Sequence, residues 1–290
     1  MKEFSYERPE SLDEALRVLA ASGSGAEVLA GGTDLVIAMR NRWREPKVVV
    51  DLKRIAELYP ALVWADETVT LSAAATMTQV VHDEGINKHF PALAEAASAV
   101  GSVQIRNRAT LVGNICNGSP AADSAPPLLA HDAVVVVAGP NGMRRVPIDD
   151  FIVGPGRTDL HEGEIGFALD LTVPSRPVGA AYERMTRRKG TDLASVTLCA
   201  TVDDVGVTRI AFGSVGPRAW LRSDATGVLA DPDAPADSKA AILEEVFADA
   251  SPSVRSMRAS PDYRNAMLRV LGARAVERAI VRLQELQGVS

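Results

Sequence analysis

The stretch Glu27-Val28-Leu29-Ala30-Gly31-Gly32-Thr33-Asp34-Leu35 runs from a short apolar strand directly into a glycine-rich loop. Glycine tolerates positive φ and lets the backbone approach a ligand closely. Successive N–H groups in such a turn form an anion-binding nest, and each hydrogen bond to a charged acceptor contributes about 1.5–3 kcal/mol. This loop can therefore hold a pyrophosphate without a lysine, although a tight strand-to-helix turn explains the same residues equally well.

A second segment of small and polar residues extends from Gln104 to Asp123. Within it, Thr110 and Asn114 place polar groups around Gly113, and Asp123 can accept hydrogen bonds from a ribose, as acidic residues do in other dinucleotide sites. Taken alone, Asp123 is more often a helix cap or a turn residue. The two segments together favour a nucleotide site of a kind other than the Rossmann fold.

Motifs for independent catalysis are missing. The chain has no G-x-G-x-x-G after a strand and no Walker A lysine loop. Its four histidines are scattered, and none is paired with an obvious serine or cysteine nucleophile. Its two cysteines, Cys116 and Cys199, cannot hold an iron–sulfur cluster, which takes four ligands. The sequence therefore predicts a binding site without catalytic residues.

The elements around the first loop alternate between helix and strand. Ser11-Leu12-Asp13-Glu14 is a capping-box pattern that begins a helix, in which the Glu reaches back to the cap. A strand, the glycine loop, a helix from about Leu35 and the strand Val48–Val50 follow. This order predicts a small α+β or α/β unit. Further on, we expect a strand at Thr68–Leu71 and a second capping box at Thr76–Gln79.

The pattern changes past residue 175. Two apolar strands, Val196–Val202 and Val207–Phe212, flank a hairpin turn, and two helices follow. In the last helix, from about Pro261, an apolar stripe is predicted at Met267, Val270, Leu271, Ile280 and Leu283. We therefore expect a first domain over residues 1–175, divided into about 1–58 and 59–175, and a second over 176–290.

Composition excludes several classes of protein. The 290 residues carry a net charge of −6 and show no clustered basic face, so nucleic-acid binding is not expected. No run of about 18 apolar residues is present, so no membrane span is expected. The N-terminus has no signal-peptide pattern, and we expect a cytoplasmic protein.

The two glycine segments resemble the FAD-binding segments of the flavin subunit in the xanthine dehydrogenase and carbon monoxide dehydrogenase family. Four further segments match in the expected order: Gly154–Arg157, Arg188–Ala194, Ala211–Val215 and Arg258–Arg264. The similarity covers essentially the whole chain and is greatest to the bacterial xanthine dehydrogenase type. It implies an α+β fold: a two-part PCMH-type FAD-binding domain followed by a C-terminal domain like that of CO dehydrogenase flavoproteins, an antiparallel sheet with helices.

The resemblance also implies which residues contact FAD. The first loop is expected to wrap the pyrophosphate, the second to hold it from the other side, and Asp123 to contact the adenosine. Arg184 stands where relatives usually have Lys, which weakens its assignment, and Leu193 stands where some have an aromatic residue. A solvated pair of Arg184 and Asp192 on a loop is the alternative. The expected cofactor contacts are Val28, Leu29, Ala30, Gly31, Gly32, Thr33, Asp34, Leu35, Val100, Thr110, Gly113, Asn114, Cys116, Asp123, Arg184 and Asp192.

The resemblance places substrate chemistry on other chains. A large molybdenum subunit would hydroxylate a purine, another N-heterocycle or an aldehyde. Electrons would then pass through two [2Fe–2S] clusters of a small subunit to FAD and on to NAD⁺ or another acceptor, in a dimer of heterotrimers. Two alternatives remain: a self-sufficient FAD oxidoreductase, disfavoured by an aromatic content of 4%, and a scaffold without cofactor, disfavoured by the intact glycines.

Overall fold

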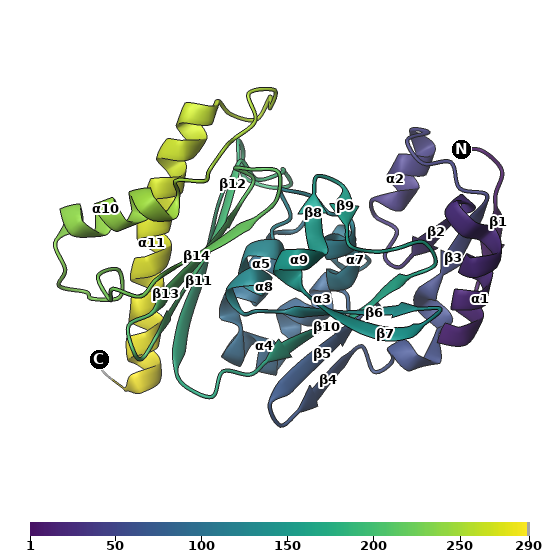
Figure 1. Ribbon diagram of the computed structural model, residues 1–290, viewed down its shortest axis with the longest axis horizontal. Helices are drawn as coiled ribbons and strands as arrows, with labels where there is room; N and C mark the ends of the chain where they lie inside the picture. Colours follow the sequence, from purple (N-terminus) through teal and green to yellow (C-terminus); the bar gives the residue numbers. More distant parts are fainter. Residues whose placement is uncertain (289–290) are drawn as a thin grey trace.

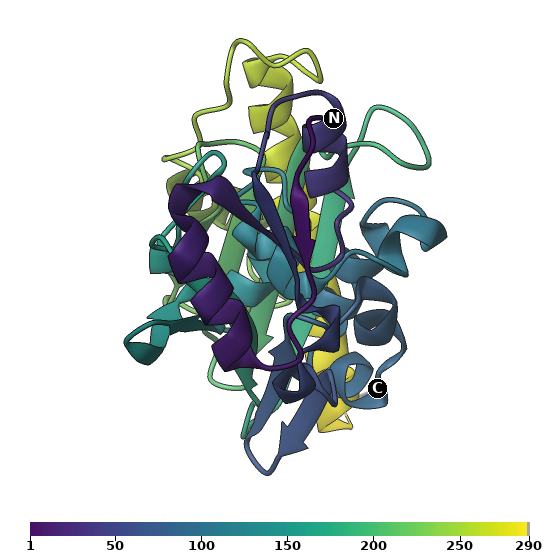
Figure 2. The ribbon, with the colours of Figure 1, turned by 90° about the vertical axis from the view of Figure 1, so that its right-hand side faces the viewer.

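The computed structural model describes residues 1–288, which form an α+β fold built on three main sheets in a row. In Figure 1 the sheet of the first subdomain lies at one end, a five-stranded sheet lies in the middle, and the C-terminal sheet with its long helix lies at the other end. Figure 2 looks onto the first subdomain, with the other two sheets behind it. Within the described residues, no helix has both the length and the apolarity that a membrane span requires.

The first subdomain is a parallel sheet with two helices. Its strands are β1 (Ser5–Glu7), β2 (Ala26–Leu29) and β3 (Val48–Asp51) in the order β1-β3-β2, and its helices are α1 (Leu12–Ser22) and α2 (Leu35–Arg40). Ser11 caps α1 as predicted, because its Oγ accepts from the N–H of Glu14. The expected return bond is wrong: the Glu14 carboxylate accepts from Glu10 N instead, at 2.9 Å. Short 3-10 turns, η1 (Gly23–Gly25), η2 (Leu52–Arg54) and η3 (Ala56–Leu58), complete this part.

The second subdomain is an antiparallel sheet covered by short helices. The strand order is β4 (Leu62–Ala65), β5 (Thr68–Ser72), β10 (Ile165–Thr172), β6 (Val134–Gly139) and β7 (Gly142–Pro147). The helices are α3 (Met77–His82), α4 (Glu84–His89), α5 (Pro91–Ala99), α6 (Val103–Arg106), α7 (Leu111–Cys116), α8 (Ala125–Ala130) and α9 (Ile148–Phe151), and a small hairpin joins β8 (Ile152–Gly154) to β9 (Arg157–Thr158). The predicted capping box at Thr76 and Gln79 is confirmed in full.

The C-terminal domain is a four-stranded antiparallel sheet held between helices. Its strands follow chain order: β11 (Val178–Met185), β12 (Val196–Asp203), β13 (Thr208–Gly213) and β14 (Trp220–Asp224). Helix α10 (Ala236–Val246) precedes α11 (Pro261–Gln287), which lies along β11 and β12 (Figure 1). The two backbones are in close contact, since a Cβ on Gly179 would meet Ala279 O at 1.9 Å.

The apolar stripe predicted on the last helix is right except at one position. Leu271, Ile280 and Leu283 are buried, and Met267 packs at the edge of the same core. Val270 is exposed, because α11 contacts the sheet along the line of Leu268, Leu271, Ala275 and Ala279, and residue 270 falls to one side of that line.

One carboxylate joins the two domains. Glu95 on α5 accepts from Arg278 on α11 at 2.7 Å, from Arg282 one turn further on, and from the N–H of Tyr182 on β11 at 3.0 Å. Helices α5 and α8 thus contact the face of the C-terminal sheet opposite α11. Since Glu95 is the common acceptor, it fixes the C-terminal domain against the flank of the second subdomain.

We expect Glu95→Ala to lower the free energy of unfolding by about 2 kcal/mol, because it removes one acceptor from two partly buried guanidinium groups and from one N–H. Urea unfolding of the purified chain measures this loss. The control is Glu244→Ala, which removes the exposed pair with Arg269 and should cost about 0.5 kcal/mol or less. Equal losses in the two variants would show that Glu95 is an ordinary surface charge.

Candidate functional site

The first glycine loop connects β2 to α2 and is shaped by two glycines with different constraints. Gly32 has φ of +76°, a conformation that L side chains rarely adopt. Gly31 lies against the second segment, because a Cβ built on it would come within 2.1 Å of Arg108 O. Both positions therefore require glycine, one for its backbone conformation and one for close approach.

The backbone of this loop presents unused donors. Among the described residues, none accepts a hydrogen bond from the N–H groups of residues 31–35, whereas the next donor, Val36 N, bonds to Gly32 O at 3.0 Å. The Asp34 side chain does not cap α2. Five consecutive backbone donors at the start of a helix are thus available to an anionic ligand, which is what the predicted anion-binding loop requires.

The second segment packs directly on the first. Thr110 caps α7, and its Oγ1 accepts from Gly113 N at 3.2 Å. A Cβ on Gly113 would lie 2.7 Å from that oxygen and 4.0 Å from the Cβ of Ala30, so the cap explains this glycine. Bonds from Met77 N to Ala109 O and from Leu111 N to Ala75 O fix the segment to the second subdomain.

The junction of the two segments encloses a cavity of about 90 Å³. Its wall includes Ala30 and Thr110 and also residues that the sequence analysis did not select: Lys53, Tyr59, Asn107 and Arg108. Lys53 donates to Ala30 O at 3.3 Å and pairs with Asp51 at 2.5 Å. Desolvation alone would raise the pKa of Asp51, but hydrogen bonds from Lys53 and Tyr6 hold it below its ordinary value.

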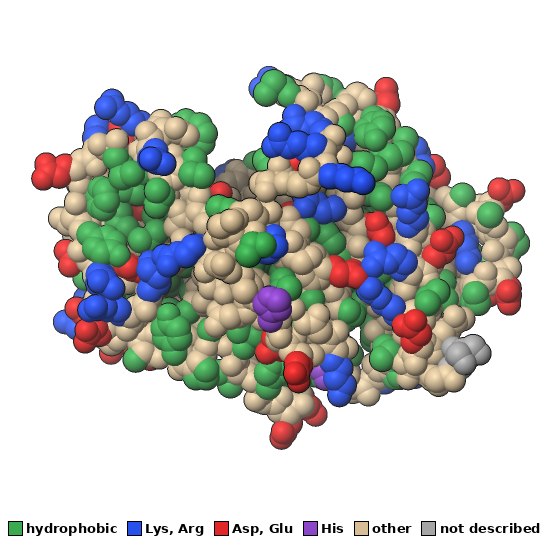
Figure 3. All heavy atoms as spheres, turned by 180° about the vertical axis from the view of Figure 1, so that it is seen from behind, with side chains coloured by type: hydrophobic (Ala, Val, Ile, Leu, Met, Phe, Trp, Pro, Cys, Tyr) green, Lys and Arg blue, Asp and Glu red, His purple; other side chains and the backbone are tan. Residues whose placement is uncertain are grey.

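The molecular surface is hollowed at this junction. Figure 3 shows the molecule from behind, with a deep notch in its upper edge between the lobe of the first subdomain and the rest of the chain. Lys and Arg side chains stand on both sides of the notch.

Asp123 lies in a buried polar network between the domains. Only 8% of the residue is exposed, and its Oδ1 accepts from Tyr182 Oη at 2.6 Å. Arg184 Nε lies 3.3 Å from the same oxygen, an ion pair without a hydrogen bond. Desolvation raises the pKa of Asp123 to about 6, against the opposing effects of Arg184 and Tyr182.

Arg184 uses the geometry of a guanidinium, so its departure from the usual Lys has a structural reason. Nη1 donates to Ala99 O and Nη2 to Asp192 O, each at 2.7 Å, while Nε faces Asp123. A lysine could not reach all three directions. The side chain thus connects α5, the β11–β12 loop and the second glycine segment.

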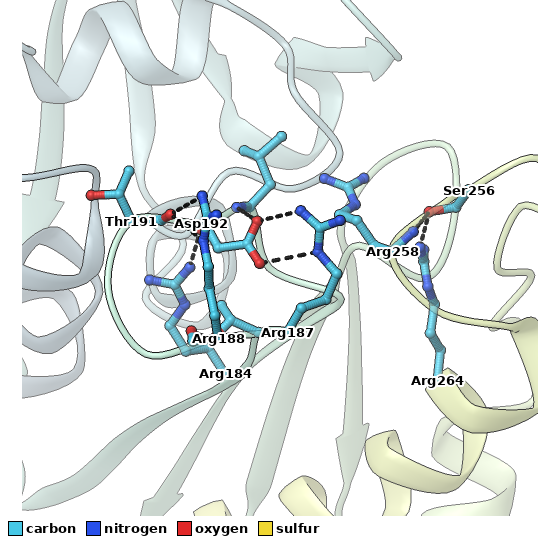
Figure 4. Close-up of polar contacts among 10 residues, drawn as sticks. Arg184, Arg187, Arg188, Thr191, Asp192, Ser256, Arg258 and Arg264 are labelled. Carbon is cyan, nitrogen blue, oxygen red and sulfur yellow. Dashed lines mark hydrogen bonds and ion pairs between the residues drawn. The ribbon is translucent and has the colours of Figure 1, made fainter.

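The Asp192 side chain belongs to a different pair. Arg187 binds it through two hydrogen bonds, and this lowers its pKa to about 2. Figure 4 shows Arg184, Arg187 and Arg188 converging on the turn at Thr191 and Asp192. Arg184 thus contacts only the backbone carbonyl of Asp192, and the two side chains have other partners. The alternative of a solvated ion pair between Arg184 and Asp192 is therefore wrong, since only 18% and 4% of their side chains are exposed.

Three other predicted residues lie near the second segment. Val100 ends α5, and its carbonyl accepts from Arg106 at 3.1 Å. Asn114 Oδ1 accepts from Ser124 Oγ at 2.6 Å. Cys116 faces the five-stranded sheet, with Sγ 2.5 Å from a Cβ built on Gly166, and burial raises the pKa of its thiol to about 12. The Cys116 side chain is therefore a core contact.

The raised pKa of Asp123 makes part of the stability depend on pH. The folded chain holds this proton more tightly than the unfolded chain, whose carboxyl titrates near 3.8. The contribution is therefore full below about pH 4 and is lost as pH rises through about 6. We expect the stability of the wild-type chain relative to Asp123→Asn to fall by about 3 kcal/mol between about pH 4 and 7, in paired urea unfolding series. A difference independent of pH would contradict the shift.

Two family descriptions match almost the whole chain. Residues 2–175 match the FAD binding domain in molybdopterin dehydrogenase, and residues 180–279 match the CO dehydrogenase flavoprotein C-terminal domain. The xanthine dehydrogenase FAD-binding subunit of Escherichia coli O157:H7 is 33% identical over 281 residues, which cover 95% of this chain and 96% of that protein. The carbon monoxide dehydrogenase medium chain of Hydrogenophaga pseudoflava is 31% identical, covering 96% of this chain and 98% of the relative.

The fold agrees with a solved relative. The structure of carbon monoxide dehydrogenase from Hydrogenophaga pseudoflava lacking the Mo-pyranopterin moiety matches with a TM-score of 0.89 at 31% identity, over 97% of this chain and 98% of that chain. The expected two-domain α+β fold and the FAD cofactor are thus confirmed. This chain belongs to the FAD-binding subunits of the xanthine dehydrogenase and carbon monoxide dehydrogenase family of molybdenum hydroxylases, and it is an oxidoreductase subunit.

Proposed function

We propose that this chain holds FAD where its two glycine segments meet and relays electrons within a molybdenum hydroxylase complex. Electrons come from [2Fe–2S] clusters of a small partner subunit and leave to NAD⁺ or another acceptor, while a large molybdenum subunit oxidises a purine or another N-heterocycle. The observation that carries this proposal is the row of five N–H donors at residues 31–35, beside a second segment that closes the loop from the other side. The name of the xanthine dehydrogenase relative supports the substrate class.

The residues of the site fit the cofactor. Free N–H groups at Gly31–Leu35 suit an anionic pyrophosphate, which needs donors and no general base. Thr110 and Asn114 fix the opposite wall through their own hydrogen bonds. Asp123 can accept a hydrogen bond from the adenosine through Oδ2, because Tyr182 and Arg184 both contact Oδ1. Bound FAD supplies the electron chemistry, and the chain supplies binding, orientation and electrostatics.

Gly31→Ala tests the loop. The added methyl would meet Arg108 O at 2.1 Å, so the two segments must move apart, and we expect FAD affinity to fall at least about tenfold, the equivalent of 1.4 kcal/mol. Flavin fluorescence titration and the flavin-to-protein ratio measure the change. Gly154→Ala is the matched control, since no atom lies within 4 Å of its Cβ position and its φ is not positive. Full FAD binding by Gly31→Ala would show that the glycine loop is only a strand-to-helix turn and does not bind the cofactor.

The electron-relay role is tested by expressing the chain alone and together with the products of neighbouring genes. We expect about one FAD per chain, and substrate turnover only when iron–sulfur and molybdenum subunits copurify. Turnover of xanthine by the isolated flavin-loaded chain would replace the proposal with a self-sufficient oxidoreductase. A chain without flavin in both preparations would leave a scaffold.

A further inference from the structure

Two loops at one edge of the C-terminal sheet carry a cluster of five exposed or half-exposed cations. The first, residues 186–193, connects β11 to β12, and the second, residues 251–260, precedes α11. Their exposed or half-exposed cations are Arg187, Arg188, Lys189, Arg255 and Arg258. In Figure 4 the side chains of Arg187 and Arg258 extend toward each other from the two loops.

The positive charge of these loops is largely uncompensated. Arg187 is paired with Asp192, and Arg188 donates to Thr191 O, a neutral acceptor. Among residues 1–288, no carboxylate lies within 4 Å of Arg188, Lys189, Arg255 or Arg258, although the chain as a whole is acidic with a net charge of −6. The arrangement thus concentrates positive potential on one edge of an acidic protein.

A buried arginine fixes the second loop in place. Only 2% of Arg264 is exposed, and it donates to Ser214 O at 2.9 Å and to Ser256 Oγ within the loop. Its charge has no carboxylate partner among the described residues, and burial together with the nearby Arg258 lowers its pKa. The 251–260 loop is therefore anchored by a cation that adds to the positive charge of the surface.

Apolar side chains stand among these cations. The exposed fractions are 95% for Met257 and 83% for Val254. Such exposure of large apolar groups is unfavourable in water unless a partner covers them. Met and Arg are enriched in protein interfaces, whereas a small anion would gain nothing from Met257 or Val254.

We propose a docking surface for an acidic electron-carrier protein on these two loops. It consists of the cations Arg187, Arg188, Lys189, Arg255 and Arg258 and the apolar residues Val254 and Met257. This inference rests on the proposed function, because it assigns the partner as the acceptor of the electrons that the flavin releases. Charge complementarity selects an acidic partner, and the exposed apolar tips select a protein over a free phosphate. The surface also lies close to the proposed flavin site. Arg184 on β11 contacts Asp123 of the second glycine segment, and the 186–193 loop begins two residues after Arg184.

Binding of the FAD-loaded chain to a [2Fe–2S] ferredoxin, an acidic carrier, tests the proposal by biolayer interferometry. We expect binding at an ionic strength of about 0.01 M and its loss at about 1 M, where the Debye length shrinks from about 30 to about 3 Å. The double variant Arg255→Glu/Arg258→Glu should weaken binding at least about tenfold. Met257→Ala, which leaves the charge unchanged, should weaken it about threefold.

The control reverses two charges elsewhere. Arg17→Glu/Arg274→Glu makes the same change at exposed positions on α1 and α11 and should leave ferredoxin binding within about twofold of the wild type. Thermal unfolding establishes that each variant is folded. Equal losses of ferredoxin affinity in the two double variants would show that only the net charge of the chain matters, and would overturn the docking surface.

Three further results would overturn it. The first is the absence of ferredoxin binding at low salt. The second is binding of pyrophosphate to these arginines, with no effect of Met257→Ala on ferredoxin binding. The third is that Arg255→Glu/Arg258→Glu no longer copurifies with the iron–sulfur and molybdenum subunits. The second result would indicate a small-anion site, and the third would place the surface inside the complex. The flavin-to-protein ratio is measured separately. A chain that binds ferredoxin but contains no FAD would contradict the proposed function and leave the docking surface standing.

Discussion

The contact between Gly31 and the carbonyl of Arg108 is the constraint on which the site depends. It joins two segments that are 77 residues apart in the chain and that belong to different subdomains. Because no side chain fits between them, the loop that carries the free N–H groups packs directly on the wall formed by the second segment. The capped turn at Thr110 keeps that wall rigid. The binding site is therefore a product of how two small units pack, and each unit alone has half of it.

The C-terminal domain is joined to the second glycine segment by side-chain contacts. Glu95 fastens α11 and β11 to α5, and the network of Tyr182, Arg184 and Asp123 links β11 to the second glycine segment. Two side chains of β11 therefore connect the domain interface to Asp123, Tyr182 by a hydrogen bond and Arg184 by an ion pair. The same strand leads into the cationic loop, so the domain interface, the proposed flavin site and the proposed docking surface all adjoin β11.

The sequence alone predicted the elements with strong local signals. The helix beginning at Ser11, the Thr76 capping box and the hairpin between β12 and β13 follow from caps, turns and period-two apolar runs. Short edge strands such as β1 and β4 lack those signals, because they are mostly exposed and are defined only by their pairing with a neighbouring strand. Lys53 and Tyr182 were missed for the same reason: each becomes informative only beside Ala30 or Asp123. Val270 was wrongly assigned to the buried stripe, because sequence spacing alone does not separate an apolar residue beside the stripe from one within it.

Burial of the two thiols has a consequence for a protein that handles reducing equivalents. Cys116 and Cys199 are free, and desolvation raises the pKa of both, to about 12 for Cys116. The thiolate is the reactive species toward peroxide and alkylating agents, and at neutral pH almost none is present. Neither thiol of this chain is therefore a ready target for hydrogen peroxide or an alkylating agent, and we expect both cysteines to stay reduced in the folded chain.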